Sequence, residues 1–537
     1  MERRSRMRVD AAFIPAIAVL LFGTALHAQI NQADDNQGNT LSPRPLVSDS
    51  EGSKDPTDPQ GTDLDTFGLG EFTAQTTPVA REAYSKGMEF SAQGRPDAAL
   101  QQFNQAVEAD PSFARGFLAK AKALSALGQQ RLAIRTLSSG LAVAEGPAES
   151  ADIYLERGTL HLSSGQYQKA LDDFDHAYEQ QPTRADVAWQ RGKALRMLAA
   201  EESVLGVEAA SERMRQATAA FDRAIELQED LVDARADRAS LRADLGQTDE
   251  AIEDMERAVE LQPEDAALQF RLAALLLRRT GGRHEVASEA TLRDDLNRAD
   301  LSRAIELLTQ SLASSSSNTE EAPDPQQVQL VRAVASIELA ALLPAVQRTG
   351  RYEAALHDCK TVLSKEPRMA AAHFQQGIVL RMLGRYRDAI SAFSEALRLS
   401  PENAEARLRR GIAWFYAGEL DLAMRDFQEI GVMPGDGRPW LWTGIIHARR
   451  GDHLEAIRAY SEAIDENPRF ALCYSNRALS LMHLGHWQRA IDDLNAMILL
   501  DPDDAKAHQR RGLAQRQLGR TTEAERSFQK AAELARQ

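Results

Sequence analysis

The stretch that decides the fold is RYRDAISAFSEALRLSPENAEARLRRGIAWFYAGEL, residues 385–420. Its first half places Ala389, Phe393 and Ala396 at spacings i, i+4 and i+7, so the three side chains share one face of a helix. Pro401 cannot continue that helix, and a second helical pattern follows it up to a glycine. The stretch therefore predicts short helices separated by turns, with no strand.

The same pattern returns further along the chain, as HLEAIRAYSEAIDENPRFALCYSNRALSLMHLGHW at 453–487 and WQRAIDDLNAMILLDPDDAKAHQRRGLAQRQLGR at 487–520. A small residue recurs on the first helix of each unit at intervals of 34, 33, 34 and 34: Gly377, Gly411, Gly444, Ala478 and Gly512. A second one recurs on the second helix at the same intervals: Ala389, Ala423, Ala456, Ala490 and Ala524. A fixed period of this size is the signature of a solenoid.

The repeated residues have a physical reason. Small side chains let two helix backbones approach closely, and the aromatic residue or leucine between them fills the groove that this leaves. Glycine can adopt the left-handed conformation that ends a helix, and we predict this role at positions 384, 418, 451, 485 and 519. Prolines such as Pro401 and Pro468 separate one unit from the next.

This pattern resembles the tetratricopeptide repeat family over most of the chain from about residue 80. The family's small, small, aromatic and small positions and its proline are found here as Gly87, Ala99, Phe103, Ala106 and Pro111, as Gly158, Ala170, Phe174, Ala177 and Pro182, and as Gly377, Ala389, Phe393, Ala396 and Pro401. The resemblance implies an all-α fold, a right-handed superhelical solenoid of about twelve helix-turn-helix units. The first helices of the units would line a concave groove.

The period is interrupted in three places. Extra residues occur near 199–212 and 278–297, and a Ser/Pro-rich loop occupies 313–325. We therefore predict two blocks of repeats, 79–312 and 326–537, and leave the repeat phase around 278–345 open.

The N-terminus has the layout of a secretory signal. Four arginines precede the apolar run AAFIPAIAVLLFGTAL, and His27-Ala28 lies before a polar sequence. We predict a signal peptide at 1–28, with an uncleaved membrane anchor as the alternative. Residues 29–78 are polar and rich in Pro, Gly and Ser, which predicts a disordered linker. The chain thus resembles exported bacterial members of the family, in the periplasm or cell envelope or fully secreted.

Composition and motifs argue against several classes of function. The net charge is −16 and no basic stripe is interleaved with aromatics, which argues against nucleic-acid binding. Of the two cysteines, Cys359 and Cys473 both fall at packing positions, and we predict that they are buried. The chain lacks HExxH, GxSxG, P-loop and GxGxxG motifs, so we predict no enzyme activity, no cofactor and no metal site. We interpret the acidic pairs at 172–173 and 492–493 as solvated helix faces.

The resemblance implies that partners bind to the first helices. Those of the middle units carry acidic residues, namely Asp186, Asp233, Asp237 and Asp244. Those nearer the C-terminus carry cations and aromatics, namely Arg381, Arg409, Arg438, Arg449, Lys506, Arg510, Phe374, Phe415 and Trp442. A basic, aromatic-lined groove would suit an acidic or C-terminal peptide. The alternative is ordinary solvated helix surface.

One part of this set is similar to the family's carboxylate clamp for chaperone tails. Asn476, Lys506 and Arg510 correspond to two thirds of that clamp. The preceding unit has Leu441 and Ile445 where the clamp needs a lysine and an asparagine, so the clamp is incomplete.

These observations favour a non-catalytic scaffold or adaptor outside the cytoplasm that binds protein or peptide partners in its groove. A first alternative is a structural envelope protein that self-associates through the ends of the solenoid, where Phe528 and Leu534 are expected to be partly exposed. A second is a protein associated with a cell-wall polymer, with Trp414 and Trp442 as stacking residues.

Overall fold

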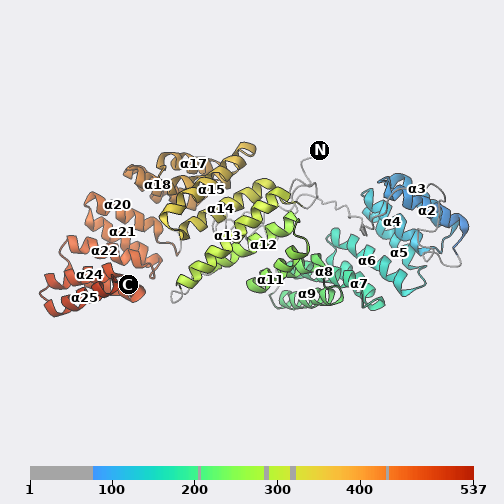
Figure 1. The fold of residues 1–537 in the computed structure, drawn as a ribbon, viewed down its shortest axis with the longest axis horizontal. Coiled ribbons are helices and arrows are strands. Elements are labelled where there is room, and N and C mark those ends of the chain that lie inside the picture. Colours follow the sequence, from blue (N-terminus) through green and yellow to red (C-terminus); the bar gives the residue numbers. More distant parts are fainter. Residues whose placement is uncertain (1–75, 203–206, 283–289, 315–321, 431–434, 537) are drawn as a thin grey trace, which may run out of the picture. The chain divides into compact units, whose positions relative to one another are not determined.

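The computed structural model describes residues 76–202, 207–282, 290–314, 322–430 and 435–536. These residues form 24 α-helices and no strand, and successive helices pair into hairpins (Figure 1). The prediction of an all-α repeat fold of about twelve helical hairpins is therefore confirmed. The predicted signal peptide and nearly all of the predicted linker lie outside the described residues. Of the predicted linker only the last residues, from 76 on, are described, and there Thr77 caps a helix that begins at Pro78.

The helices belong to two compact units, and the division between them in the sequence falls within α12 (Ala266–Gly282). The first unit, up to Leu275, contains five hairpins: α2 (Pro78–Ala92) and α3 (Pro96–Ala109), α4 (Ala114–Ala126) and α5 (Gln130–Leu141), α6 (Pro147–Ser163) and α7 (Tyr167–Gln180), α8 (Ala185–Glu202) and α9 (Val207–Leu227), α10 (Val232–Asp244) and α11 (Thr248–Leu261).

The second unit begins at Leu276 and continues through seven hairpins, the first of which pairs the end of α12 with α13 (Ala290–Ser314). The others are α14 (Pro325–Leu342) and α15 (Ala345–Lys365), α16 (Ala370–Met382) and α17 (Tyr386–Leu399), α18 (Ala404–Ala417) and α19 (Leu420–Ile430), α20 (Arg438–Arg450) and α21 (His453–Glu466), α22 (Ala471–His483) and α23 (Trp487–Leu500), α24 (Ala505–Gln517) and α25 (Thr521–Leu534).

Each hairpin closes over its small residues. A Cβ atom added to Gly377 on α16 would lie 2.6 Å from the ring of Phe393 on α17, and one added to Gly158 would lie 2.6 Å from the ring of Phe174. Phe393 and Ala389 are fully buried. The predicted close approach of the two helices, filled by an aromatic ring, is therefore present in both units.

The turns between helices follow the glycines. Gly418 and Gly451 end α18 and α20 with φ of 88° and 87°, a conformation that costs an L side chain energy but not glycine. Positive φ also occurs at 384, 485 and 519, so all five predicted left-handed glycines are confirmed.

The sequence insertions lengthen helices. α16 and α17 have the regular lengths of 13 and 14 residues, whereas α8 has 18, α9 has 21 and α13 has 25. The extra residues near 199–212 and 278–297 thus extend hairpins at their turn ends, apart from the positions outside the described residues.

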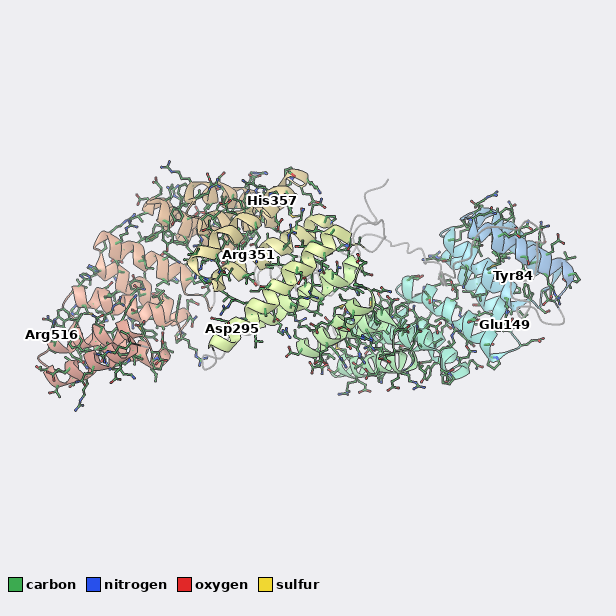
Figure 2. The ribbon with its side chains drawn as sticks, in the orientation of Figure 1. Tyr84, Glu149, Asp295, Arg351, His357 and Arg516 are labelled. Atoms are coloured by element: carbon green, nitrogen blue, oxygen red, sulfur yellow. The ribbon has the colours of Figure 1, made fainter. Side chains whose placement is uncertain are left out.

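Within a unit, the first helices of neighbouring hairpins contact one another, as α16, α18, α20 and α22 do. We call the surface formed by these first helices the inner face. Arg516 on α24 belongs to the last hairpin (labelled in Figure 2). Its guanidinium carbon is 5.8 Å from the centroid of the Phe528 ring on α25. Phe528 and Leu534 are both half-buried, as predicted.

Candidate functional site

Buried ion pairs inside the hairpins account for many of the charged side chains. Arg477 on α22 donates two hydrogen bonds to Asp493 on α23, at 2.8 and 2.9 Å. Arg157 contacts Asp173 in the same way, with its shortest bond at 2.6 Å. The same arrangement recurs in both units: Arg157–Asp173, Arg238–Asp254, Arg332–Asp358, Arg410–Asp426 and Arg477–Asp493. We call these the Arg–Asp pairs.

The Arg–Asp pairs correct one interpretation of the sequence. Asp173 and Asp493 are only 4% and 7% exposed, so they do not belong to solvated faces. Their neighbours Asp172 and Asp492 are exposed, as expected. The signal that could have found four of the five pairs is an arginine directly before the small residue of the first helix, with an aspartate 16 residues later; Arg332 and Asp358 are 26 residues apart.

The same arginines also bridge neighbouring hairpins. Arg410 and Arg477 each donate a further hydrogen bond to a serine on the preceding second helix, Ser394 at 3.3 Å and Ser461 at 2.9 Å. Each of these arginines lies on one helix and donates hydrogen bonds to side chains on two others. These side chains therefore stabilise the stack and are not candidates for binding a partner.

The acidic inner face of the first unit is largely paired as well. Asp186 accepts hydrogen bonds from Arg184, and Asp244 accepts one from Arg196 at 3.0 Å. Asp237 accepts a 2.7 Å hydrogen bond from the indole N–H of Trp189. At least three of the four predicted acidic residues thus have partners within the unit.

In the second unit, two of the predicted cations share one carboxylate. Glu405 on α18 accepts from Arg409 at 2.6 Å and from Arg438 on α20 at 2.8 Å. Arg438 also pairs with Asp436 at 2.7 Å. Two positive and two negative groups therefore lie together, and this cluster has no net charge to offer a ligand.

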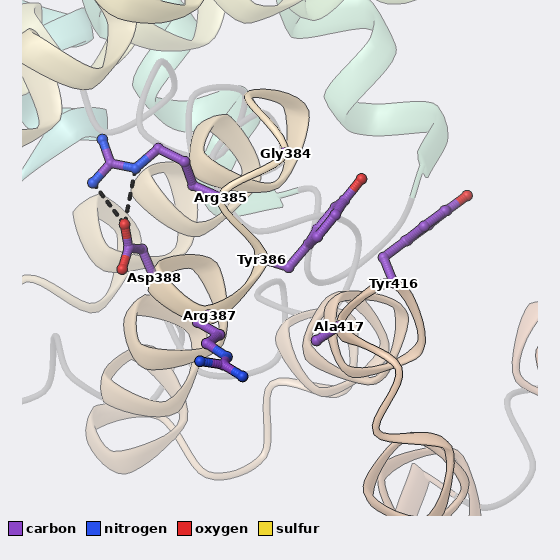
Figure 3. A pocket seen from close by; sticks show the side chains of 7 residues that line it. All are labelled: Gly384, Arg385, Tyr386, Arg387, Asp388, Tyr416 and Ala417. Atoms are coloured by element: carbon purple, nitrogen blue, oxygen red, sulfur yellow. Dashed lines mark hydrogen bonds and ion pairs between the residues drawn. The ribbon is translucent and has the colours of Figure 1, made fainter.

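Aromatic side chains form the most distinctive part of this inner face. Phe415 and Tyr416 at the end of α18 each meet the indole of Trp442 on α20 edge-on, with ring centroids 5.2 and 6.0 Å apart. Tyr386, at the start of α17, stacks on Tyr416 at 5.4 Å, and their hydroxyl groups point the same way (Figure 3). We call Tyr386, Phe415, Tyr416 and Trp442 the aromatic cluster. Tyr416 is 49% exposed, so the cluster is open to solvent.

Arg449 on α20 lies at one side of the aromatic cluster. Its guanidinium carbon is 5.2 Å from the centroid of the Phe415 ring, a cation–π arrangement. Arg449 is exposed. The sequence prediction had named Arg449, Phe415 and Trp442 separately, and the structure brings them together.

Arg381, near the end of α16, differs from the other arginines. Its Nε atom is enclosed yet has no hydrogen-bond partner in the described residues, and one terminal nitrogen contacts only the sulfur of Met382, at 3.3 Å. Burial, and then the nearby charge of Arg409, lower the pKa of Arg381. Both causes penalise its positive charge, and no carboxylate among the described residues pairs with it.

The remaining predicted site residues are placed differently. Phe374 is 4% exposed and packs against Phe393, so its ring faces the core. Asn476 donates to the carbonyl of Leu472 in its own helix, and Arg510 donates to Ser475 at 2.5 Å. Lys506 is exposed.

A few further groups bear on possible chemistry. Burial raises the pKa of both Cys359 and Cys473 to about 12, and both thiols are free and buried as predicted. Burial also raises the pKa of Glu338 on α14 to about 7. In the described part of the chain, no three histidine, cysteine or acidic side chains gather as metal ligands would. Over the same residues, every helix is too short or too polar to span a lipid bilayer.

Comparison with known proteins identifies the class. The tetratricopeptide repeat model matches residues 84–128, 118–185, 236–294, 341–403, 374–432 and 475–537, which is more than half of the chain. The chain therefore belongs to the tetratricopeptide repeat family. Proteins of this family bind protein or peptide partners and are typically non-catalytic scaffolds.

Particular relatives match only in part. Human DnaJ homolog subfamily C member 7 is 38% identical over 91 residues, 17% of this chain and 18% of that protein. A homolog of it in Dictyostelium discoideum is 26% identical over 196 residues, 33% of this chain and 36% of that protein. The chain thus spans well under half the length of these curated relatives.

Among solved structures, yeast Tom70 aligns with a TM-score of 0.38 and 16% identity, over 85% of this chain and 92% of that one. MamA aligns with a TM-score of 0.28 and 26% identity, over 30% of this chain and 94% of that one.

Proposed function

We propose that this chain is a non-catalytic scaffold that holds an acidic segment of a partner protein on the inner face of its second unit, across α16, α18 and α20. The observation that carries the proposal is the aromatic cluster with the exposed Arg449 over Phe415. Aromatic rings and arginine are the side chains that most often dominate binding energy at protein interfaces.

Charge supports the choice of an acidic segment. The cations of the Arg–Asp pairs are neutralised within the hairpins, and Arg409 and Arg438 are neutralised by Glu405 and Asp436. Arg381 and Arg449 have no carboxylate partner among the described residues. The net field at this part of the inner face therefore favours an anion, although the whole chain is acidic.

Site-specific crosslinking tests the proposal. A photo-crosslinking amino acid replaces Tyr416 on the inner face, and in a matched variant it replaces Arg398, which is on the second helix α17 with a side chain 59% exposed. We expect partner crosslinks from position 416 and few from position 398. The crosslinked segments should be rich in Asp and Glu, and their yield should fall as salt rises. Equal yields at the two positions would contradict the proposal.

We further propose that the scaffold acts outside the cytoplasm, because residues 1–28 have the layout of a secretory signal. N-terminal sequencing of the protein from fractionated cells tests this. Export with cleavage predicts a mature chain that begins at Gln29, and export with an uncleaved anchor predicts an intact N-terminus in the membrane fraction. Leu20→Arg should abolish export by breaking the apolar run. An intact chain in the cytoplasmic fraction would overturn this proposal.

A further inference from the structure

Arg381 differs from the arginines of the Arg–Asp pairs in having no carboxylate partner among the described residues. Arg157, Arg410 and Arg477 each place the guanidinium against a buried carboxylate. Arg381 is similarly half-buried, but its Nε has no partner and no ion pair joins it to the described residues. A buried guanidinium without a counter-ion destabilises the folded chain. An external anion would remove that penalty.

The surroundings of Arg381 contain further donors without partners. Tyr352 on α15 is only 4% exposed, and its hydroxyl has no hydrogen-bond partner in the described residues. The positive charge of Arg381 acts on that hydroxyl: burial raises the pKa of Tyr352, while Arg348 and Arg381 oppose the increase. The hydroxyls of Tyr416 and Tyr386 likewise oppose the effect of burial on the pKa of Arg381. The rings of these two tyrosines, on α18 and α17, stack on each other with centroids 5.4 Å apart.

We propose that Arg381 anchors a single carboxylate of the bound protein segment. The inference rests on the proposed function and names the group recognised. One unbalanced positive charge matches a monoanion better than a phosphate dianion, because Arg409 is already neutralised by Glu405. The stacked rings of Tyr386 and Tyr416 lie beside the anchor, so the segment carries an aromatic residue next to the carboxylate.

A first measurement separates an anchor from a structural residue. Arg381→Met in the full chain removes an unpaired charge and the repulsion from Arg409, so its melting temperature should rise by about 1–3 °C. Arg385→Met is the matched control, because Arg385 lies in the next turn but pairs with Asp388 at 2.6 Å (Figure 3). The control should melt at or slightly below the parent temperature. A fall for Arg381→Met would show that the arginine supports the fold, and would overturn the proposal.

A second measurement tests recognition directly. Three otherwise identical fluorescent peptides are used: one ends in Trp with a free C-terminal carboxylate, one is amidated with Asp beside the Trp, and one is amidated with Asn in place of that Asp. We expect the parent chain to bind one of the two carboxylate peptides at least about tenfold more tightly than the Asn peptide. The peptide that is preferred tells whether the carboxylate comes from a chain end or from a side chain.

The variants distinguish the carboxylate anchor at Arg381 from binding by the inner face as a whole. Arg381→Met should lose the tenfold preference, and Arg385→Met should keep it. If Arg381→Met keeps the preference while Trp442→Ala weakens all three peptides, the inner face binds but Arg381 is not the anchor. If the parent binds none of the peptides more tightly than the Asn control, the carboxylate anchor is wrong. Crosslinking at Tyr416 then decides separately whether the inner face binds a partner at all.

Discussion

The inner faces of the two units are built from the same kind of helical hairpin but differ in how their polar side chains are paired. Across α8 and α10 in the first unit, Trp189 donates to Asp237 and Arg196 pairs with Asp244. Across α16 to α20 in the second unit, Arg381 has no carboxylate partner in the part of the chain that the structure describes, and the ring of Tyr416 is open to solvent. A face whose polar groups are hydrogen-bonded to one another gains little from binding a ligand. A face with unpaired polar groups gains hydrogen bonds or ion pairs when a ligand binds. The comparison therefore points to the second unit as the binding region.

The largest effect we expect is on the Arg–Asp pairs, which both units share. Asp493→Ala should lower the free energy of unfolding by about 3–5 kcal/mol, because it leaves Arg477 buried without its carboxylate. The adjacent Asp492→Ala should change it by less than about 0.5 kcal/mol, since Asp492 is exposed. Urea unfolding of both variants measures the difference.

In the first unit, Asp173→Ala and Asp172→Ala should give the same contrast as their counterparts in the second. Similar losses for Asp172→Ala and Asp173→Ala would mean that the buried pair does not hold the hairpin. The view that Arg–Asp pairs stabilise the hairpins of both units would then be wrong. The proposals for the inner face would not be affected, because they have separate tests.

The next effect concerns the close approach of the helices. Ala389→Leu in the second unit and Ala170→Leu in the first should each cost about 1–3 kcal/mol, because both alanines are fully buried and have no room for a larger side chain. Thermal unfolding measures this. Equal costs in the two units would confirm that their helices are packed equally tightly. A markedly smaller cost in one unit would show that its helices are packed less tightly.

A smaller, pH-dependent effect is expected at Glu338, a half-buried acid on α14 with no ion pair among the described residues. Burial raises its pKa to about 7, so the folded chain prefers the neutral carboxyl. Its cost is absent below the unfolded pKa, near 4.5, grows as pH rises from there to about 7, and is fully present above that pH. Glu338→Gln should therefore stabilise the chain by about 1–2 kcal/mol at pH 8 and hardly at all at pH 4.

Glu156 is the matched residue in the first unit. Burial raises its pKa too, but Lys122, 3.8 Å away, opposes the increase. Glu156→Gln should show a weaker pH dependence than Glu338→Gln when unfolding is followed at both pH values. The reverse order would contradict the view that charges of the first unit are the better paired.

Most of the fold could be predicted from the sequence, because each hairpin depends on local spacing. Gly377 and Phe393 meet across one hairpin at a separation that recurs along the chain, and the left-handed glycines follow from the same period. The candidate site could be predicted only as a list of side chains on first helices. Whether Arg409 is paired with Glu405 and Arg381 is left unpaired depends on the length and direction of side chains from different helices, which spacing does not determine.

The Arg–Asp pairs lie between these two cases. The spacing of Arg477 and Asp493 is regular enough to be read from the sequence, but a pair of adjacent aspartates such as 492–493 looks like solvated surface until the arginine on the other helix is considered. Burial of a charge is a property of the pair rather than of either residue.

The most direct test of the account compares two matched pairs of side chains on the two inner faces. Arg449 lies over Phe415 in the second unit, and Lys193 lies over Trp189 in the first, 4.6 Å from the ring centroid. The affinity of the partner crosslinked at Tyr416 is measured for both double alanine variants. We expect it to fall at least about tenfold for Phe415→Ala with Arg449→Ala, and to stay within about twofold for Trp189→Ala with Lys193→Ala. The opposite order, or an equal loss in both, would contradict the assignment of binding to the second unit.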